Sequence, residues 1–110
     1  MDNFFEKNIL NKIPMLQDEH KKVLREIYQD AVKKNCIHEF QFDKYLSQSM
    51  KYTDIKNNCS NMDDTVLCVC LSDLEGLGFL VNTMRNPYKE MEYAISYLGM
   101  LYIKIHENIQ

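Results

Sequence analysis

A helical repeat of apolar positions runs from about Leu16 to Lys34 and predicts the first strong helix. Its apolar stripe consists of Val23, Leu24, Ile27, Tyr28, Ala31 and Val32, with His20 one turn earlier. We expect His20 to be a partly buried packing residue, because no motif beside it suggests a ligand or base. Asp30 and Lys34 have the spacing of a helix-supporting ion pair.

The segments on either side of this helix carry weaker patterns. Residues 1–13 can hold a leading helix over Asn3–Ile13, and Pro14 either ends it or starts the next element. A second, shorter helix is predicted over Asp43–Met50, with inward positions at Phe42, Tyr45, Leu46 and Met50. Lys51–Asn61 is polar and rich in turn residues, so we interpret most of it as an exposed connection with a helical turn around Thr53–Lys56.

A third helix is expected after Asp63 and Asp64, either of which can cap its N-terminus. Its buried stripe would be Leu67, Cys70, Leu71 and Leu74. The β-branched Val66 and Val69 leave a strand possible, but the caps, spacing and length favour a helix. Gly78 is best placed to end this helix in the left-handed conformation.

The last third of the chain alternates between strand and helix signals. Phe79–Val81 and Met91–Ser96 have strand character, and Arg85-Asn86-Pro87 between them is a turn signature. Ser96 can then cap a last helix, whose predicted stripe is Leu98, Leu101, Tyr102, Ile105 and Ile109. The chain of 110 residues is therefore predicted to form one α+β domain, mostly α, of the winged helix-turn-helix type, with a two-stranded wing and a C-terminal helix.

Two stretches carry a resemblance to known families. One is Leu71-Ser72-Asp73-Leu74-Glu75-Gly76-Leu77-Gly78-Phe79-Leu80-Val81, and the other is Tyr93-Ala94-Ile95-Ser96-Tyr97-Leu98-Gly99-Met100-Leu101-Tyr102. The pair is similar to the C-terminal winged-helix domain of the abortive-infection alpha family of phage-defence proteins, and more loosely to regulators of the multiple-antibiotic-resistance type. The resemblance implies a binding module that works in phage defence, counter-defence or regulation. The closing helix departs from the usual pattern, because Ser96, Tyr97, Leu98 and Met100 stand where many relatives have a threonine, a proline and a basic residue.

Charge decides between the two kinds of partner that such a fold can take. The chain has a net charge of -3, and residues 57–84 contain no Lys or Arg. The predicted third helix instead carries the candidate protein-binding residues Asp63, Asp64, Asp73 and Glu75. An acidic helix would be repelled by phosphates, so we expect a protein partner or self-association rather than the usual DNA contact.

DNA binding by a transcriptional regulator is the alternative. Its candidate residues are Lys21, Lys22, Arg25, Arg85 and Lys89. Acidic residues are interleaved with them on the first helix and on the wing, which is more typical of an ordinary solvated surface.

No catalytic, metal or cofactor site is expected. The sequence lacks a glycine-rich phosphate loop, a nucleophile elbow and a paired His and carboxylate at metal-ligand spacing. Cys68 and Cys70 would point to opposite sides of a helix, which argues against a zinc site. We therefore expect the cysteines to be small buried hydrophobic residues; they are Cys36, Cys59, Cys68 and Cys70. The N-terminus does not resemble a secretory signal and no apolar run is long enough to span a membrane, so we expect a cytoplasmic protein.

Overall fold

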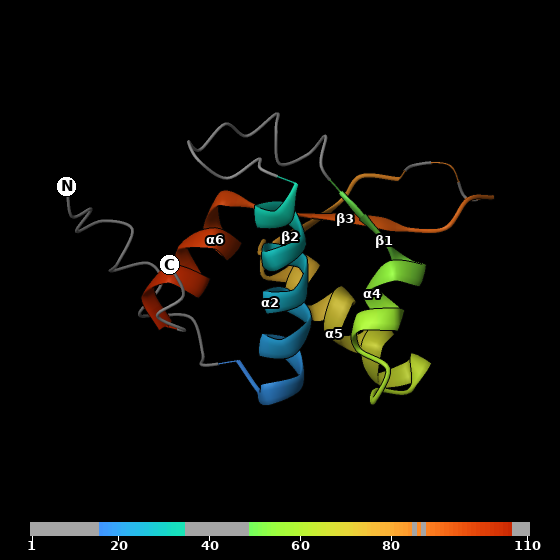
Figure 1. Cartoon of the computed structure of the whole chain (residues 1–110), viewed down its shortest axis with the longest axis horizontal. Helices are drawn as coiled ribbons and strands as arrows, with labels where there is room; N and C mark the ends of the chain where they lie inside the picture. The colour runs from blue at the N-terminus through green and yellow to red at the C-terminus, as the bar shows by residue number, and fades with distance from the viewer. Residues whose placement is uncertain (1–15, 35–48, 85, 87, 107–110) are drawn as a thin grey trace.

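The computed structural model of the chain describes residues 16–34, 49–84, 86 and 88–106. The elements are α2 (Asp18–Lys33), β1 (Met50–Lys51), α4 (Tyr52–Asn58), α5 (Asp64–Gly76), β2 (Leu80–Asn82), β3 (Glu92–Ile95) and α6 (Tyr97–His106). This is a mostly helical α+β fold with a winged-helix-like layout (Figure 1). The predicted leading helix Asn3–Ile13, and the predicted helix Asp43–Met50 up to residue 48, lie outside the described residues.

Strands β2 and β3 form the predicted wing hairpin, which projects to the right in Figure 1. They are antiparallel, with Leu80 opposite Ile95 and Asn82 opposite Tyr93. The sheet has a third strand that the sequence pattern did not predict. This strand, β1, pairs with the other side of β3, which gives the strand order β1-β3-β2. A strand of two residues is too short to leave a periodic signal.

Two predictions for the segment before α5 were wrong. Met50 is buried as predicted, but it lies in β1 opposite Tyr93 and does not end a helix. Most of Lys51–Asn61 is exposed as predicted, but it is mainly the helix α4 and not a connection, since the helical turn expected at Thr53–Lys56 extends over Tyr52–Asn58. The buried side chains of Ile55 and Cys59 pack this short helix against the core. At its N-terminus, the Thr53 backbone N–H donates a hydrogen bond to the Glu90 carboxylate of the wing at 3.0 Å.

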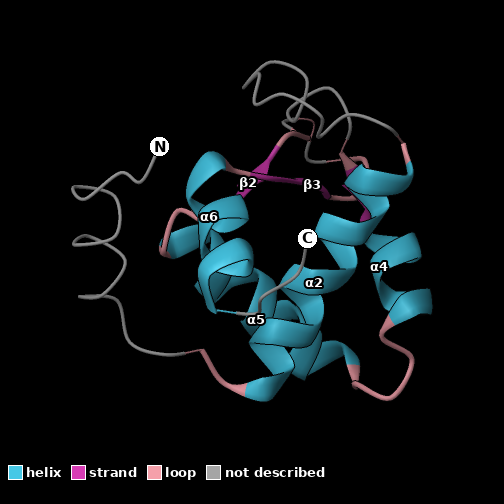
Figure 2. Cartoon of the chain, turned by 60° about the vertical axis from the view of Figure 1, so that its left-hand side comes forward, coloured by secondary structure: helices cyan, strands magenta, loops and turns pink. Residues whose placement is uncertain are grey.

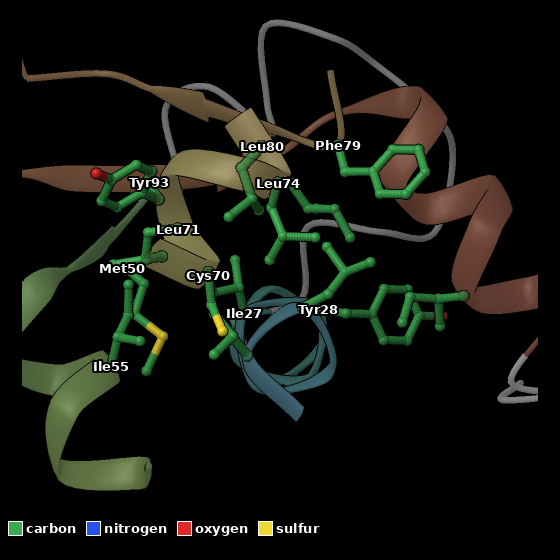
Figure 3. Packing of buried hydrophobic residues seen from close by; sticks show 14 of the residues in the cluster. Ile27, Tyr28, Met50, Ile55, Cys70, Leu71, Leu74, Phe79, Leu80 and Tyr93 are labelled. Atoms are coloured by element: carbon green, nitrogen blue, oxygen red, sulfur yellow. The ribbon is translucent and has the colours of Figure 1, made fainter. Parts of the chain in front are cut away.

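The core lies between α2, α5 and the sheet, with α4 and α6 packed against α2 (Figures 1 and 2). Figure 3 shows Ile27 of α2 facing Cys70, Leu71 and Leu74 of α5, while the Tyr28 ring of α2 extends to the right of them in the same core. The predicted stripe of the third helix is confirmed, because its four members, Leu67 included, are buried. Fully burying a large aliphatic side chain contributes about 1.5–3 kcal/mol, so these helices are held mainly by this contact.

Two predicted stripes need correction at their edges. Val32 is 46% exposed, because it falls about 100° around the helix from the centre of the buried face of α2. In α6 the buried residues are Gly99, Met100, Tyr102 and Ile103, whereas the predicted Ile105 is exposed. The helix turns its Gly99 side toward the hairpin, and a Cβ on Gly99 would lie 2.3 Å from the carbonyl oxygen of Phe79.

Gly78 ends α5 as predicted, with a φ of 83°. The backbone N–H of Phe79 donates to the Leu74 carbonyl at 2.9 Å, and the N–H of Gly78 donates to the Glu75 carbonyl at 3.0 Å, which together form a Schellman motif. Ser96 fixes the next junction. Its backbone N–H donates to the Phe79 carbonyl, and its hydroxyl oxygen accepts from the Gly99 N–H at 3.1 Å to cap α6.

Candidate functional site

Helix α5 buries one side and presents an uncharged surface on the other. The exposed residues of this surface, which we name the α5 face, are Thr65, Val66, Cys68, Val69, Ser72 and Gly76. At 3.6 residues per turn they cover an arc of about 160°. Asp73 lies inside this arc beside its Val66 edge, so the uncharged part is centred on Thr65, Val69, Ser72 and Gly76. Val69 is 52% exposed and is the most exposed large apolar residue of α5. A helix surface in contact with water normally carries charged side chains, so the composition of the α5 face is unusual.

Three shallow hollows border the α5 face, with volumes of about 410, 320 and 420 Å³. They adjoin one another, because Ser72, Thr65 and Val69 each line two of them. Gln17 and His20, at the start of α2, line two of the hollows as well. No Lys or Arg lines any of these three hollows, whereas Glu19, Asp64 and Asp73 do. The α5 face is therefore a surface of small and apolar side chains with an acidic border.

The predicted acidic residues at the start of α5 both have internal contacts. Asp63 is the N-cap, and its Oδ1 accepts a hydrogen bond from the Val66 N–H at 2.8 Å. Asp64 accepts from the Tyr52 hydroxyl at 3.0 Å and lies 3.4 Å from the Lys56 Nζ. Burial raises the pKa of Tyr52, and so do its hydrogen bonds to Cys68 and Asp64, so the phenol stays protonated. The Asp64 side chain nevertheless remains 75% exposed.

The other two acidic candidates lie near the end of α5. Asp73 Oδ2 lies 2.9 Å from His20 Nε2, which joins the end of α5 to the start of α2. The His20 side chain is 15% exposed, as expected for a partly buried packing residue, while Asp73 is 52% exposed. The Glu75 carboxylate is exposed, with no hydrogen bond or ion pair to another described residue. The structure thus places the four acids at both ends of α5 instead of gathering them into one cluster.

The alternative nucleic-acid set does not come together on one element. Lys21, Lys22 and Arg25 are half-buried in the first half of α2, and the Lys22 Nζ pairs with the Glu26 carboxylate at 2.8 Å. Lys89 is exposed on the wing, which lies toward the C-terminal end of α2 in Figure 1. Lys89 and Lys51 line a hollow together with Glu90 and Glu92, so two positive charges are offset by two negative charges there. Arg85 lies outside the described residues.

Ser72, Asp73 and His20 line one hollow, but they do not have the geometry of a catalytic triad. A triad needs the histidine to bind the acid through one ring nitrogen and the serine through the other. The second ring nitrogen of His20, Nδ1, is buried and has no hydrogen-bond partner among the described residues. Ser72 therefore has no base beside it in this arrangement.

The thiols are separated as the helical pattern predicts. Cys59 and Cys70 are buried as expected, but the expectation was wrong for Cys68, which is exposed on the α5 face, on the opposite side of the helix from Cys70. Burial raises the pKa of the Cys70 thiol, and the nearby Glu19 and Asp73 charges raise it further. Across the residues that the structure describes, no three His, Cys, Asp or Glu side chains gather closely enough to hold a metal ion.

Sequence reasoning identified the acids around α5 but missed the uncharged surface between them. A helical projection of residues 64–76 contains the signal, because the positions opposite Leu67, Cys70 and Leu74 hold no charged residue of either sign. The contribution of Gln17, Glu19 and His20 had no such signal, since it depends on how the start of α2 packs against α5.

Within the described residues, no helix combines the length and the apolar character that a membrane span requires. No family model, curated protein or solved structure matches this chain.

Proposed function

We propose that this chain is a non-enzymatic winged-helix domain that binds a protein through the α5 face and its acidic border. The observation that carries the proposal is the exposed surface of α5, which holds apolar and small side chains and is bordered by acids. Exposed apolar patches rimmed by polar residues are typical of protein-binding sites. Depletion of charge at the centre of a patch is typical of interface cores.

The same surface would bind DNA poorly. In helix-turn-helix proteins, the helix in the position of α5 enters the major groove, and lysines and arginines neutralise the phosphates beside it. Here the border of that helix contributes Asp64, Asp73 and Glu75, and the basic residues of α2 and the wing lie on other parts of the molecule. DNA binding by a regulator remains the alternative that the experiment below tests.

A role in phage defence, counter-defence or regulation rests on the resemblance of the segments 71–81 and 93–102 to the abortive-infection alpha family. A cytoplasmic location and the absence of a cofactor belong to the same proposal. The shallow, open hollows support it, because small-molecule sites usually enclose most of their ligand.

A matched pair of substitutions tests the binding surface. Val69→Lys places a charge at the centre of the α5 face, and Val32→Lys makes the same change at a comparably exposed valine on α2. Immobilised wild-type protein and both variants are incubated with lysate from the native host, and captured proteins are quantified by mass spectrometry. We expect the same proteins with the wild type and Val32→Lys, and their loss with Val69→Lys.

A titration with fluorescent duplex DNA tests the alternative, in which the protein binds DNA. We expect weak binding that falls steeply between about 50 and 200 mM salt. If DNA contacts α5 instead, Val69→Lys should strengthen duplex binding, because it adds positive charge beside the phosphates. Tight duplex binding by the wild type at physiological salt, or capture that does not depend on Val69, would contradict the proposed function.

A further inference from the structure

We infer that the α5 face receives one amphipathic helix of a different protein, which carries Lys or Arg on both sides of an apolar seam. This inference rests on the proposed function and specifies the chemistry of the partner. Three observations support it: the apolar groove between α2 and α5, a glycine that the fold does not require, and the distribution of charge around both.

The groove has the shape that a helix needs. Val66 and Val69 form one side, and Gln17, Glu19 and His20 at the start of α2 form the other. Gly76 and Leu77 continue it past the end of α5, where Leu16 also contributes. From Thr65 to Gly76 the α5 face extends for about 16 Å, which is three helical turns. A ridge of side chains on a second helix can lie in such a groove, with the axes about 8–10 Å apart.

Gly76 lacks an explanation within the described fold. Its φ is not positive, and a Cβ at this position would have nothing within 4 Å. Gly78 and Gly99 differ, since Gly78 has a φ of 83° and a Cβ on Gly99 would strike the Phe79 carbonyl oxygen. A helical glycine is less favourable than alanine, because it loses more backbone freedom on folding. The missing side chain on the α5 face is explained if a partner backbone approaches Gly76 closely.

The charges on the border select the partner. On a helical projection, Asp64 and Glu75 lie beyond one edge of the α5 face. Asp73 lies at its other edge, between Val69 and Val66, where Glu19 of α2 adds a second carboxylate. The Asp73 carboxylate can accept further hydrogen bonds while it contacts His20, because an ionised carboxylate has about four acceptor sites. A partner helix with Lys or Arg on both flanks pairs with these acids, whereas acidic flanks would be repelled.

The same charges argue against a second copy of this chain as the occupant. Two copies joined through the α5 face would bring Glu19, Asp64 and Asp73 against carboxylates of the other copy. Like charges juxtaposed across an interface suppress association. We therefore expect the protein alone to sediment as a monomer at micromolar concentration, and a dimer that Val69→Lys dissociates would overturn the inference.

A display library of helical peptides tests the partner chemistry directly. The library fixes Ala or Leu along an apolar seam and randomises the flanking positions to Lys, Arg, Glu, Gln or Ser. We expect selection on the full-length protein to enrich Lys and Arg on both flanks. The selected peptides should bind Val69→Lys at least about tenfold more weakly, as at an interface centre, and Val32→Lys as tightly as the wild type. Glu75→Lys should slow association most at low salt.

The outcomes distinguish failure of the inferred partner helix from failure of the proposed function. Selected flanks that are not enriched in Lys and Arg, or a selection that yields no binder, would overturn the inference. A melting temperature that falls sharply in Val69→Lys would also overturn it, because the α5 face would then be covered by another part of this chain. If host proteins are still captured through Val69 while the inference fails, the proposed function survives. If the peptide selection fails and host proteins are not captured through Val69 either, the proposed function is contradicted as well.

Discussion

Replacement of Gly76 by alanine should stabilise the folded protein. Gly76 is the last residue of α5, it is exposed, and its backbone is not in the left-handed region. Nothing lies within 4 Å of the position where the added Cβ would sit, so the substitution introduces no clash. The gain comes from the unfolded chain, since alanine has fewer backbone conformations to lose than glycine.

The magnitude follows from this position. Gly→Ala changes at compatible sites contribute about 0.4–1 kcal/mol. Gly76 is in the terminal turn, where helix propensity counts for less than in the interior, so we expect about 0.5 kcal/mol. For a domain of this size that gain raises the melting temperature by about 2–4 °C. Differential scanning calorimetry or chemical denaturation at fixed protein concentration measures it.

The other two glycines of the chain are the matched controls. Gly78→Ala should destabilise by about 1–2 kcal/mol, because a side chain is strained at a φ of 83°. Gly99→Ala should destabilise as well, because its Cβ would lie 2.3 Å from the Phe79 carbonyl oxygen, and that backbone must move. A lower melting temperature for Gly76→Ala would refute the reasoning, since it would mean that the space beside Gly76 is already filled in the folded chain.

Three further predictions concern the core and the contacts of α5. Leu74→Ala should lower the free energy of unfolding by about 2–5 kcal/mol, because the side chain is fully buried; an unchanged denaturation midpoint would contradict the packing described above. In a Cys36→Ser background, iodoacetamide should alkylate the exposed Cys68 well before Cys70, whose pKa is raised by burial; peptide mapping that finds Cys70 modified first would show that α5 is oriented differently. Asp73→Ala should cost no more than about 1 kcal/mol of stability, because its pair with His20 is half open to solvent, and a larger loss in denaturation would show that the pair is needed for folding.

The sequence was informative where one side of an element is buried and the element is several turns long. The stripe of α5 could be predicted because Leu67, Cys70 and Leu74 recur at helical spacing and the termini are marked by Asp63 and Gly78. The same argument located α2. The two wing strands were located differently, from apolar segments on both sides of a turn signature. The prediction for α6 was less accurate, because Gly99 lets one side of that helix approach the hairpin closely, and this contact depends on tertiary packing.

Short elements and paired charges were beyond the reach of sequence patterns. Strand β1 has two residues and exists because Met50 and Lys51 pair with β3. Helix α4 has a polar sequence, so its single buried Ile55 did not stand out from a loop. For the candidate site, the acidic residues could be found in the sequence, but the contact of Asp73 with His20 joins residues 53 positions apart and depends on the crossing of α2 and α5.

The two sides of α5 have different roles in our proposal: the buried side stabilises the fold, and the α5 face binds the partner. Substitutions on the α5 face can therefore test binding without unfolding the protein. The buried side holds the core together, so substitutions there unfold the protein and cannot report on a partner. The α5 face contributes little to the described fold. Val69 is half exposed, and a Cβ at Gly76 would have no atom within 4 Å. A solvent-facing helix under no other demand would be free to carry charged residues there, as α2 does at Asp18 and Lys33. If a partner requires the uncharged surface, Gly76→Ala should raise the melting temperature and weaken partner binding at once. A substitution that improved both would mean that the α5 face is not an interface.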